Sequence, residues 1–150
     1  MDKDLYREGM ALLEAGDTER AFPLLEEAWR LAPEAFERIH GLARVLELRG
    51  ERTRARELLE LAHARAPTEP GPAQDLAMTY LERGEDARAE RVLRAVLEAH
   101  PDDPTTHLYL AMALSKTEPA RARESLAKAR LHPDPERREQ AAELDRILRR

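Results

Sequence analysis

The strongest constraint in this sequence is a period of 34 residues. Pro33, Pro67 and Pro101 stand at this interval, and each follows a stretch rich in Leu, Ala and Arg. Self-similarity at a fixed period of this size is the signature of a repeat protein, in which one small unit is stacked several times. Three further columns keep the same interval: Gly16, Gly50 and Gly84; Ala21, Ala55 and Ala89; Leu25, Leu59 and Leu93.

Each period has the pattern of a helix, a tight turn and a second helix. In the second period, apolar residues recur at helical spacing, at Leu42, Leu46 and Leu48 and again at Leu58, Leu59 and Ala62. Gly50 interrupts this pattern, because glycine readily adopts the positive φ that ends a helix. Pro67 ends the second helix, since proline has no amide hydrogen and its ring clashes with the preceding turn. The predicted helices span 3–15, 18–31, 36–49, 52–65, 71–83, 86–99, 104–115, 118–131 and 135–149.

The composition agrees with an all-helical chain. Val and Ile together contribute five residues and the aromatic residues six, which leaves little to build a pleated, half-buried sheet. No cysteine is present, so disulfides, thiolate metal sites and a cysteine nucleophile are excluded. The chain also has no Asn and two Ser, a poor supply for serine chemistry. We therefore expect a protein that is not an enzyme and that uses no cofactor.

The residues inside each period match a known family. The chain resembles the tetratricopeptide repeat, whose unit follows the pattern W-x2-L-G-x2-Y, then A-x3-F, then P. Four repeats are expected, at 2–35, 36–69, 70–103 and 104–133. The matching positions are Leu5, Gly9, Leu12, Ala21, Leu25, Ala28 and Pro33; Ile39, Leu42, Ala43, Leu46, Ala55, Leu59, Ala62 and Pro67; Leu76, Ala77, Tyr80, Ala89, Leu93, Val96 and Pro101; and Leu110, Ala111, Leu114, Ala122, Leu126, Ala129 and Pro133.

The resemblance implies a right-handed α-solenoid of antiparallel helix pairs, which we expect to form a single domain over 1–150. Pro23 lies inside the second predicted helix and predicts a late start or a kink there. Repeat four lacks the turn glycine, so its helix pair is expected to be tilted or looser. Residues 135–149 predict an amphipathic capping helix that covers the last apolar face of the stack. Its apolar stripe consists of Ala141, Leu144, Ile147 and Leu148.

The first helix of each repeat carries a second stripe, about 100° around the helix from the stripe that packs on the second helix. The resemblance implies that the second stripe lines a concave face, where extended peptides or partner helices lie. Met10, Met78 and Met112 share one register of this stripe, and Arg44 takes it in the remaining repeat. Methionine is flexible and polarisable, which suits a surface that repacks around partners. The candidate partner-binding residues are Tyr6, Met10, His40, Arg44, Gln74, Met78, Tyr109 and Met112.

This stripe predicts a non-catalytic adaptor that holds a peptide or a segment of a partner protein in the concave groove. Tyr6 and Tyr109 would supply amphipathic anchors, and Arg44 a charge that grips a carboxylate of the partner. Two alternatives stay open. In one alternative, the methionines of the shared register fill gaps between adjacent first helices. In the other alternative, the chain is a self-associating structural element, because residues 1–35 carry a charge of −5 and residues 104–133 a charge of +3.

Other classes of site find little support. A subset of the resembled family clamps the C-terminal carboxylate of chaperones with Lys and Asn on these first helices, and that pattern is missing here. The five histidines show no H-x3-H or H-E-x2-H spacing, so no metal site is expected. His100 and His132 fall in His-Pro-Asp turns and are expected at helix ends, near the negative terminus of each helix. No phosphate-cradling glycine loop or nucleophile elbow occurs.

The charge and the chain start exclude two further classes of partner. The net charge is −5, with 25 basic against 30 acidic residues, whereas a general binder of nucleic acid or of anionic membranes is normally basic. The first residues form no apolar leader, and no apolar run has the length of a membrane span. We therefore expect a cytoplasmic protein. Arg outnumbers Lys 22 to 3 and Asn is absent, which fits a GC-rich or thermophilic source.

Overall fold

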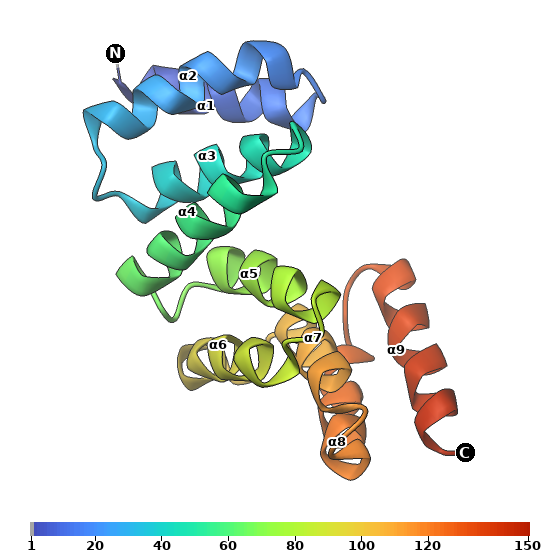
Figure 1. Ribbon diagram of the computed structural model, residues 1–150. Helices are drawn as coiled ribbons and strands as arrows, with labels where there is room; N and C mark the ends of the chain where they lie inside the picture. The colour runs from blue at the N-terminus through green and yellow to red at the C-terminus, as the bar shows by residue number, and fades with distance from the viewer. Residues whose placement is uncertain (1) are drawn as a thin grey trace. The chain divides into compact units, whose positions relative to one another are not determined.

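The computed structural model describes residues 2–150, and in that range it contains nine α-helices and no β-strand (Figure 1). Each predicted helix is present, with both ends within two residues of their expected positions. The predicted all-α class is therefore confirmed. The helices are α1 (Asp2–Glu14), α2 (Thr18–Leu31), α3 (Phe36–Leu48), α4 (Arg52–Arg65), α5 (Pro70–Glu82), α6 (Asp86–Ala99), α7 (Pro104–Leu114), α8 (Pro119–Ala129) and α9 (Pro135–Leu148).

The chain divides into two compact units, with the boundary between Ala66 and Pro67. In the first unit α1 packs on α2, α3 packs on α4, and α2 packs on α3. In the second unit α5 packs on α6, α7 packs on α8, and α6 packs on α7. The helices of each pair are antiparallel, because a turn of three or four residues joins them. The predicted helix pairs are thus confirmed within each unit, and a single domain over all four pairs stays a prediction.

The turn inside each of the first three pairs depends on a glycine with positive φ. Gly50 has φ +84°, and the amide of Glu51 donates back to the carbonyl of Leu46 at 2.9 Å. This is the left-handed helix ending that glycine adopts without steric cost. The fourth pair has no such residue, and Ser115 continues the right-handed conformation with φ −57°. The helix that follows this turn, α8, is shorter at both ends than the spacing predicts.

Pro23 does not delay the second helix, so the predicted late start is wrong. The helix begins at Thr18 because Asp17 caps it, its carboxylate accepting a hydrogen bond from the amide of Arg20 at 3.2 Å. Pro23 lies in the second turn, where its missing amide removes the helical donor for the carbonyl of Glu19. Glu19 is exposed, so water can replace the lost bond and the helix continues to Leu31.

Small residues mark the places where helices come closest. A Cβ atom on Gly9 of α1 would lie 2.7 Å from the side chain of Leu25 in α2, a distance that no methyl group could occupy without a shift of the leucine. The alanines that the period aligns are at most 1% exposed. These buried alanines are Ala21, Ala28, Ala55, Ala62, Ala89, Ala111, Ala122 and Ala129.

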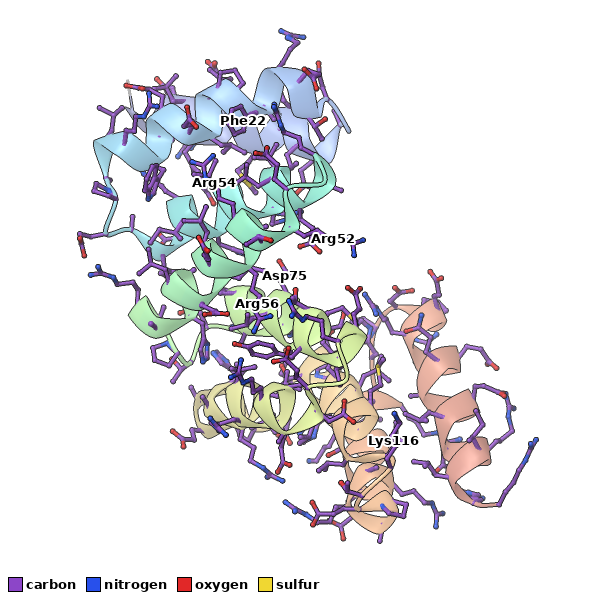
Figure 2. All side chains as sticks on the ribbon, in the orientation of Figure 1. Phe22, Arg52, Arg54, Arg56, Asp75 and Lys116 are labelled. Carbon is purple, nitrogen blue, oxygen red and sulfur yellow. The ribbon has the colours of Figure 1, made fainter. Side chains whose placement is uncertain are left out.

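Charged side chains cover the outside of the helix pairs (Figure 2). Some form ion pairs one helical turn apart, as between Arg56 and Glu60 of α4 at 2.9 Å. The guanidinium of Arg49 lies 4.1 Å from the ring centroid of Phe22 and joins the end of α3 to α2. Surface ion pairs such as Arg56–Glu60 contribute little each, about 0–1 kcal/mol. The apolar helix crossings therefore account for most of the stability.

Replacement of Ala55 by leucine tests the helix crossing in the first unit. Ala55 is 1% exposed, so the added atoms have no free space and should cost about 1–3 kcal/mol of unfolding free energy through overpacking. We expect the melting temperature to fall by roughly 2–4 °C for each kcal/mol lost. Ala64→Leu is the matched control, because Ala64 is exposed on the same helix. An unchanged melting temperature for Ala55→Leu would contradict the crossing.

Candidate partner-binding site

Tyr6 and Met10, the two candidates on α1, pack across the gap to α3. A Cβ atom on Gly41 of α3 would lie 3.1 Å from Sδ of Met10 and 3.3 Å from Cε2 of Tyr6. Both side chains are half-buried against the core of the first unit, and burial raises the pKa of the Tyr6 phenol. This contact corresponds to the alternative in which the methionine fills the space between adjacent first helices.

His40 and Arg44, the candidates on α3, already have partners within the chain. A terminal nitrogen of Arg44 lies 3.8 Å from a carboxylate oxygen of Glu14 on α1, and the Arg44 side chain is 37% exposed. His40 is half-buried and also interacts within the chain. The predicted grip of Arg44 on a partner's carboxylate would therefore compete with Glu14.

Gln74, the first candidate on α5, joins α5 to the start of α7. Its side-chain amide donates to a carboxylate oxygen of Asp103 at 3.0 Å and to the hydroxyl of Thr106 at 3.1 Å. Asp103 in turn caps α7 by accepting the amide of Thr106 at 2.9 Å. The hydrogen bonds of Gln74 thus support the packing of two first helices, a role that its register alone could not indicate.

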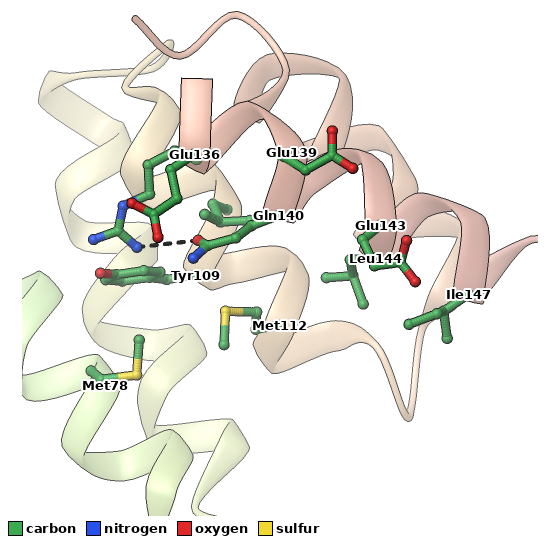
Figure 3. A pocket seen from close by; sticks show the side chains of 11 residues that line it. Met78, Tyr109, Met112, Glu136, Glu139, Gln140, Glu143, Leu144 and Ile147 are labelled. Carbon is green, nitrogen blue, oxygen red and sulfur yellow. Dashed lines mark hydrogen bonds between the residues drawn. The ribbon is translucent and has the colours of Figure 1, made fainter. Parts of the chain in front are cut away.

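The remaining candidates lie together at a pocket of 610 Å³ in the second unit (Figure 3). Met78 comes from α5, and Tyr109 and Met112 come from α7. The opposite wall belongs to α9, so the C-terminal helix forms one side of the pocket. Two apolar lining residues are open to solvent, Met112 at 37% and Ile147 at 50% exposure. The other lining residues are Leu108, Glu136, Arg137, Glu139, Gln140, Glu143 and Leu144.

All charged residues that line this pocket stand on α9. Three are acidic, Glu136, Glu139 and Glu143, and one is basic, Arg137. The Arg137 guanidinium lies 5.6 Å from the ring centroid of Tyr109 and donates to the side chain of Gln140 at 3.4 Å. Arg146, outside the lining, pairs with Glu139 at 3.1 Å and with Glu143 at 2.5 Å. The pocket therefore combines an apolar floor with an acidic rim.

The capping helix covers the last pair less completely than predicted. Ala141 is buried, but Leu144 and Leu148 are half-buried and Ile147 is exposed. The helix packs on α8, and the pocket lies along its side that faces α7. The reason lies in Asp145, which follows Ala141 by one helical turn and occupies the same face as the apolar stripe.

Asp145 is a buried carboxylate that holds α9 against α8. It accepts a hydrogen bond from Nε of Arg123 at 3.1 Å, and Arg149 and Arg130 lie at 2.9 Å and 3.8 Å from its other oxygen. The hydrogen bond from Arg123 and the charge of Arg149 hold the pKa of Asp145 below its usual range. The apolar pattern of α9 did not indicate a buried carboxylate here, although the spacing of Asp145 from Ala141 places it on the buried face.

The two His-Pro-Asp turns differ in their contacts. His100 stands at the C-terminal end of α6, as expected, and its amide donates to the carbonyl of Val96 at 2.9 Å. His132 lies beyond α8, where its Nδ1 accepts the amide of Asp134 and its Nε2 contacts the hydroxyl of Thr105 at 2.8 Å. His132 therefore shapes the entry to α9 instead of ending α8.

Two further kinds of site are absent from the described part of the chain. Among these residues, no group of three His, Asp or Glu side chains is placed to hold a metal ion. In the same part of the chain, none of the helices combines the length and the apolar character that a membrane span requires.

The comparisons with known proteins agree with this geometry. A family model of the tetratricopeptide repeat matches residues 12–70 and 48–114. A thermophilic tetratricopeptide repeat protein of Thermus thermophilus is 27% identical, with a TM-score of 0.80 over 99% of this chain and 83% of that one. PilF of Pseudomonas aeruginosa is 21% identical, with a TM-score of 0.83 over 99% of this chain and 69% of that one.

A third solved structure is similar at the level of the fold. MamA of Desulfovibrio magneticus is 21% identical, with a TM-score of 0.74 over 99% of this chain and 93% of that one. No curated protein matches the chain at a significant level. The predicted class, a solenoid of antiparallel helix pairs, is confirmed by these matches.

Asp145→Asn should weaken the docking of α9 and remove part of its pH dependence. A carboxylate whose pKa is depressed in the folded state stabilises that state above its unfolded pKa, about 3.9, and this contribution is lost as the pH falls through the folded value. We therefore expect the amide protection of α9, measured by hydrogen–deuterium exchange, to decrease in the unmodified chain once the pH is lowered past about 4. In Asp145→Asn the protection should already be low at pH 7.

Glu143→Gln is the control for this experiment, because Glu143 is exposed on the same helix. It should keep the protection of the unmodified chain at pH 7. If Asp145→Asn also kept that protection, the account of how α9 is held would be wrong.

Proposed function

The chain belongs to the tetratricopeptide repeat family, and from this premise we propose that it is a non-catalytic adaptor that binds a segment of a partner protein. The fold of this family generally mediates protein–protein interaction, and the family is typically one of scaffolding proteins. The proposed contact surface is the second stripe of the first helices. In the second unit the proposed contacts are Met78 and Met112 of this stripe, with Tyr109 beside them.

One observation carries this proposal, the apolar pocket on the stripe of the second unit. Its volume of 610 Å³ falls in the range of pockets that hold ligands, about 300–1,000 Å³. Two flexible methionines and one tyrosine lie on a floor that α5 and α7 hold in place through their packing. Rigid helices with adaptable side chains suit a surface that recognises a peptide rather than one that performs a reaction.

The candidates of the first unit have a supporting role in the proposal. Met10 and Tyr6 are half-buried and keep α1 and α3 together, so a partner would touch their edges. Arg44 would bind an acidic group of a partner only by exchanging it for Glu14. We therefore propose that most of the binding free energy arises in the second unit, with the first unit adding polar contacts.

Substitution of Met78 tests this function. A glutamate at this position would place a charge on the apolar floor, which is costly unless the charge finds a partner. We expect Met78→Glu to weaken binding of a partner captured from the source organism by at least about tenfold, as loss of a central contact typically does. Fluorescence titration of the captured partner measures the effect. Arg44→Glu should weaken the binding less.

Arg91→Glu is the charge-matched control for Arg44→Glu, because Arg91 is exposed on α6 and lies outside the first helices. It should leave the affinity unchanged. Undiminished affinity of a folded Met78→Glu variant would reject the function. Light scattering over a range of ionic strength separates it from self-association: the adaptor is a salt-insensitive monomer, whereas ends of opposite charge would form assemblies that salt dissociates.

A further inference from the structure

We propose that the pocket between α7 and α9 takes an amphipathic helix whose apolar stripe is flanked by Lys or Arg. This inference rests on the proposed function and specifies the chemistry of the partner at the second unit. Three observations support it: the length of the pocket along α9, the nature of its backbone, and the sign of its charge.

The pocket follows one face of α9 for three helical turns. Its lining includes Glu136, Gln140, Glu143 and Ile147, which are three or four residues apart and therefore share that face. At 1.5 Å per residue, the stretch between the first and last of these is about 16 Å long. A partner helix of three turns has the same length, and it would present anchors at positions i, i+4, i+7 and i+11.

The backbone around the pocket favours a helix over an extended segment. Every lining residue belongs to α5, α7 or α9, so its amide and carbonyl groups mostly serve hydrogen bonds within those helices. An extended segment would place its own amides and carbonyls against Met112, Leu144 and Ile147 without partners, which is costly. A helix satisfies its backbone internally and can bury an apolar stripe there.

The charge of the lining favours a basic partner. Neither α5 nor α7 contributes a charged side chain to the lining, and α9 contributes three carboxylates and one guanidinium. Arg137 lies over the ring of Tyr109, which directs this positive charge to the floor. Arg146 is shared by Glu139 and Glu143, and in the described chain Glu136 has no ion pair. Lysine or arginine along the edge of a bound helix would pair with this excess of negative charge, and an acidic helix would be repelled.

Synthetic peptides test the chemistry directly with the full chain. The probe is a peptide of about 16 residues, long enough to form a helix on binding, with Leu at the four anchor positions and Lys beside them. A second peptide has Glu in place of Lys, and a third has Pro at its centre. We expect fluorescence anisotropy to show binding of the Lys peptide that weakens with salt. The Glu and Pro peptides should bind at least about tenfold more weakly.

Two pairs of variants locate the site. Ile147→Ser removes an exposed apolar contact of the pocket and should weaken the Lys peptide by about tenfold. Leu131→Ser is its control, because Leu131 is 77% exposed in the same unit and does not line the pocket. Glu136→Lys should weaken the Lys peptide and reduce its salt dependence. Glu98→Lys, at an exposed position on α6, should change neither.

Several outcomes would overturn the inference. One is that the Glu peptide or the Pro peptide binds as tightly as the Lys peptide. Another is that Ile147→Ser leaves the affinity for the Lys peptide unchanged. A dimer of the chain that Ile147→Ser dissociates would show that a second copy occupies the pocket. If the Lys peptide fails to bind while Met78→Glu still weakens a captured partner, the inference is wrong and the proposed function stands. If Met78→Glu has no effect on that partner, the proposed function itself is wrong.

Discussion

The close approach of paired helices is the constraint on which the rest of the structure depends. It requires small residues at the crossings, and the chain supplies Gly9 against Leu25 and a buried alanine such as Ala21 or Ala55 in each repeat. Two helices of about a dozen residues cannot bury their apolar faces alone, so each pair depends on its neighbours. The 34-residue period therefore reflects packing, because the small residues of a helix crossing recur in each successive helix pair.

The same packing leaves a surface that no helix pair covers. Within the second unit, α5 and α7 are joined through Gln74 and Asp103, while α9 is held on α8 through Asp145 and its arginines. A helix fixed on α8 by one carboxylate stands beside α7 with space between them, and that space is the pocket. The structural role of Asp145 thus bears on function, because the position of α9 sets the wall on which the acidic rim stands.

The sequence allowed the helices and their crossings to be predicted, because both follow from local spacing and from residue size. The pocket could not be predicted in this way. It depends on Asp145, a charged residue on a face that the apolar pattern assigned to the core, and on how far Leu144 and Ile147 are left uncovered. The partners of individual side chains could not be predicted either. Gln74 and Met10 belong to the same stripe as Met78, yet Gln74 donates a hydrogen bond to Asp103 and Met10 packs over Gly41.

The most direct test of the account is to observe the methionine methyl groups by NMR while the basic helical peptide is added. Met78 and Met112 line the pocket, whereas Met10 packs between α1 and α3. We expect the methyl resonances of Met78 and Met112 to shift together with saturation, and that of Met10 to stay in place. A shift confined to Met10, or saturable binding with no change at Met78 and Met112, would contradict binding in the pocket.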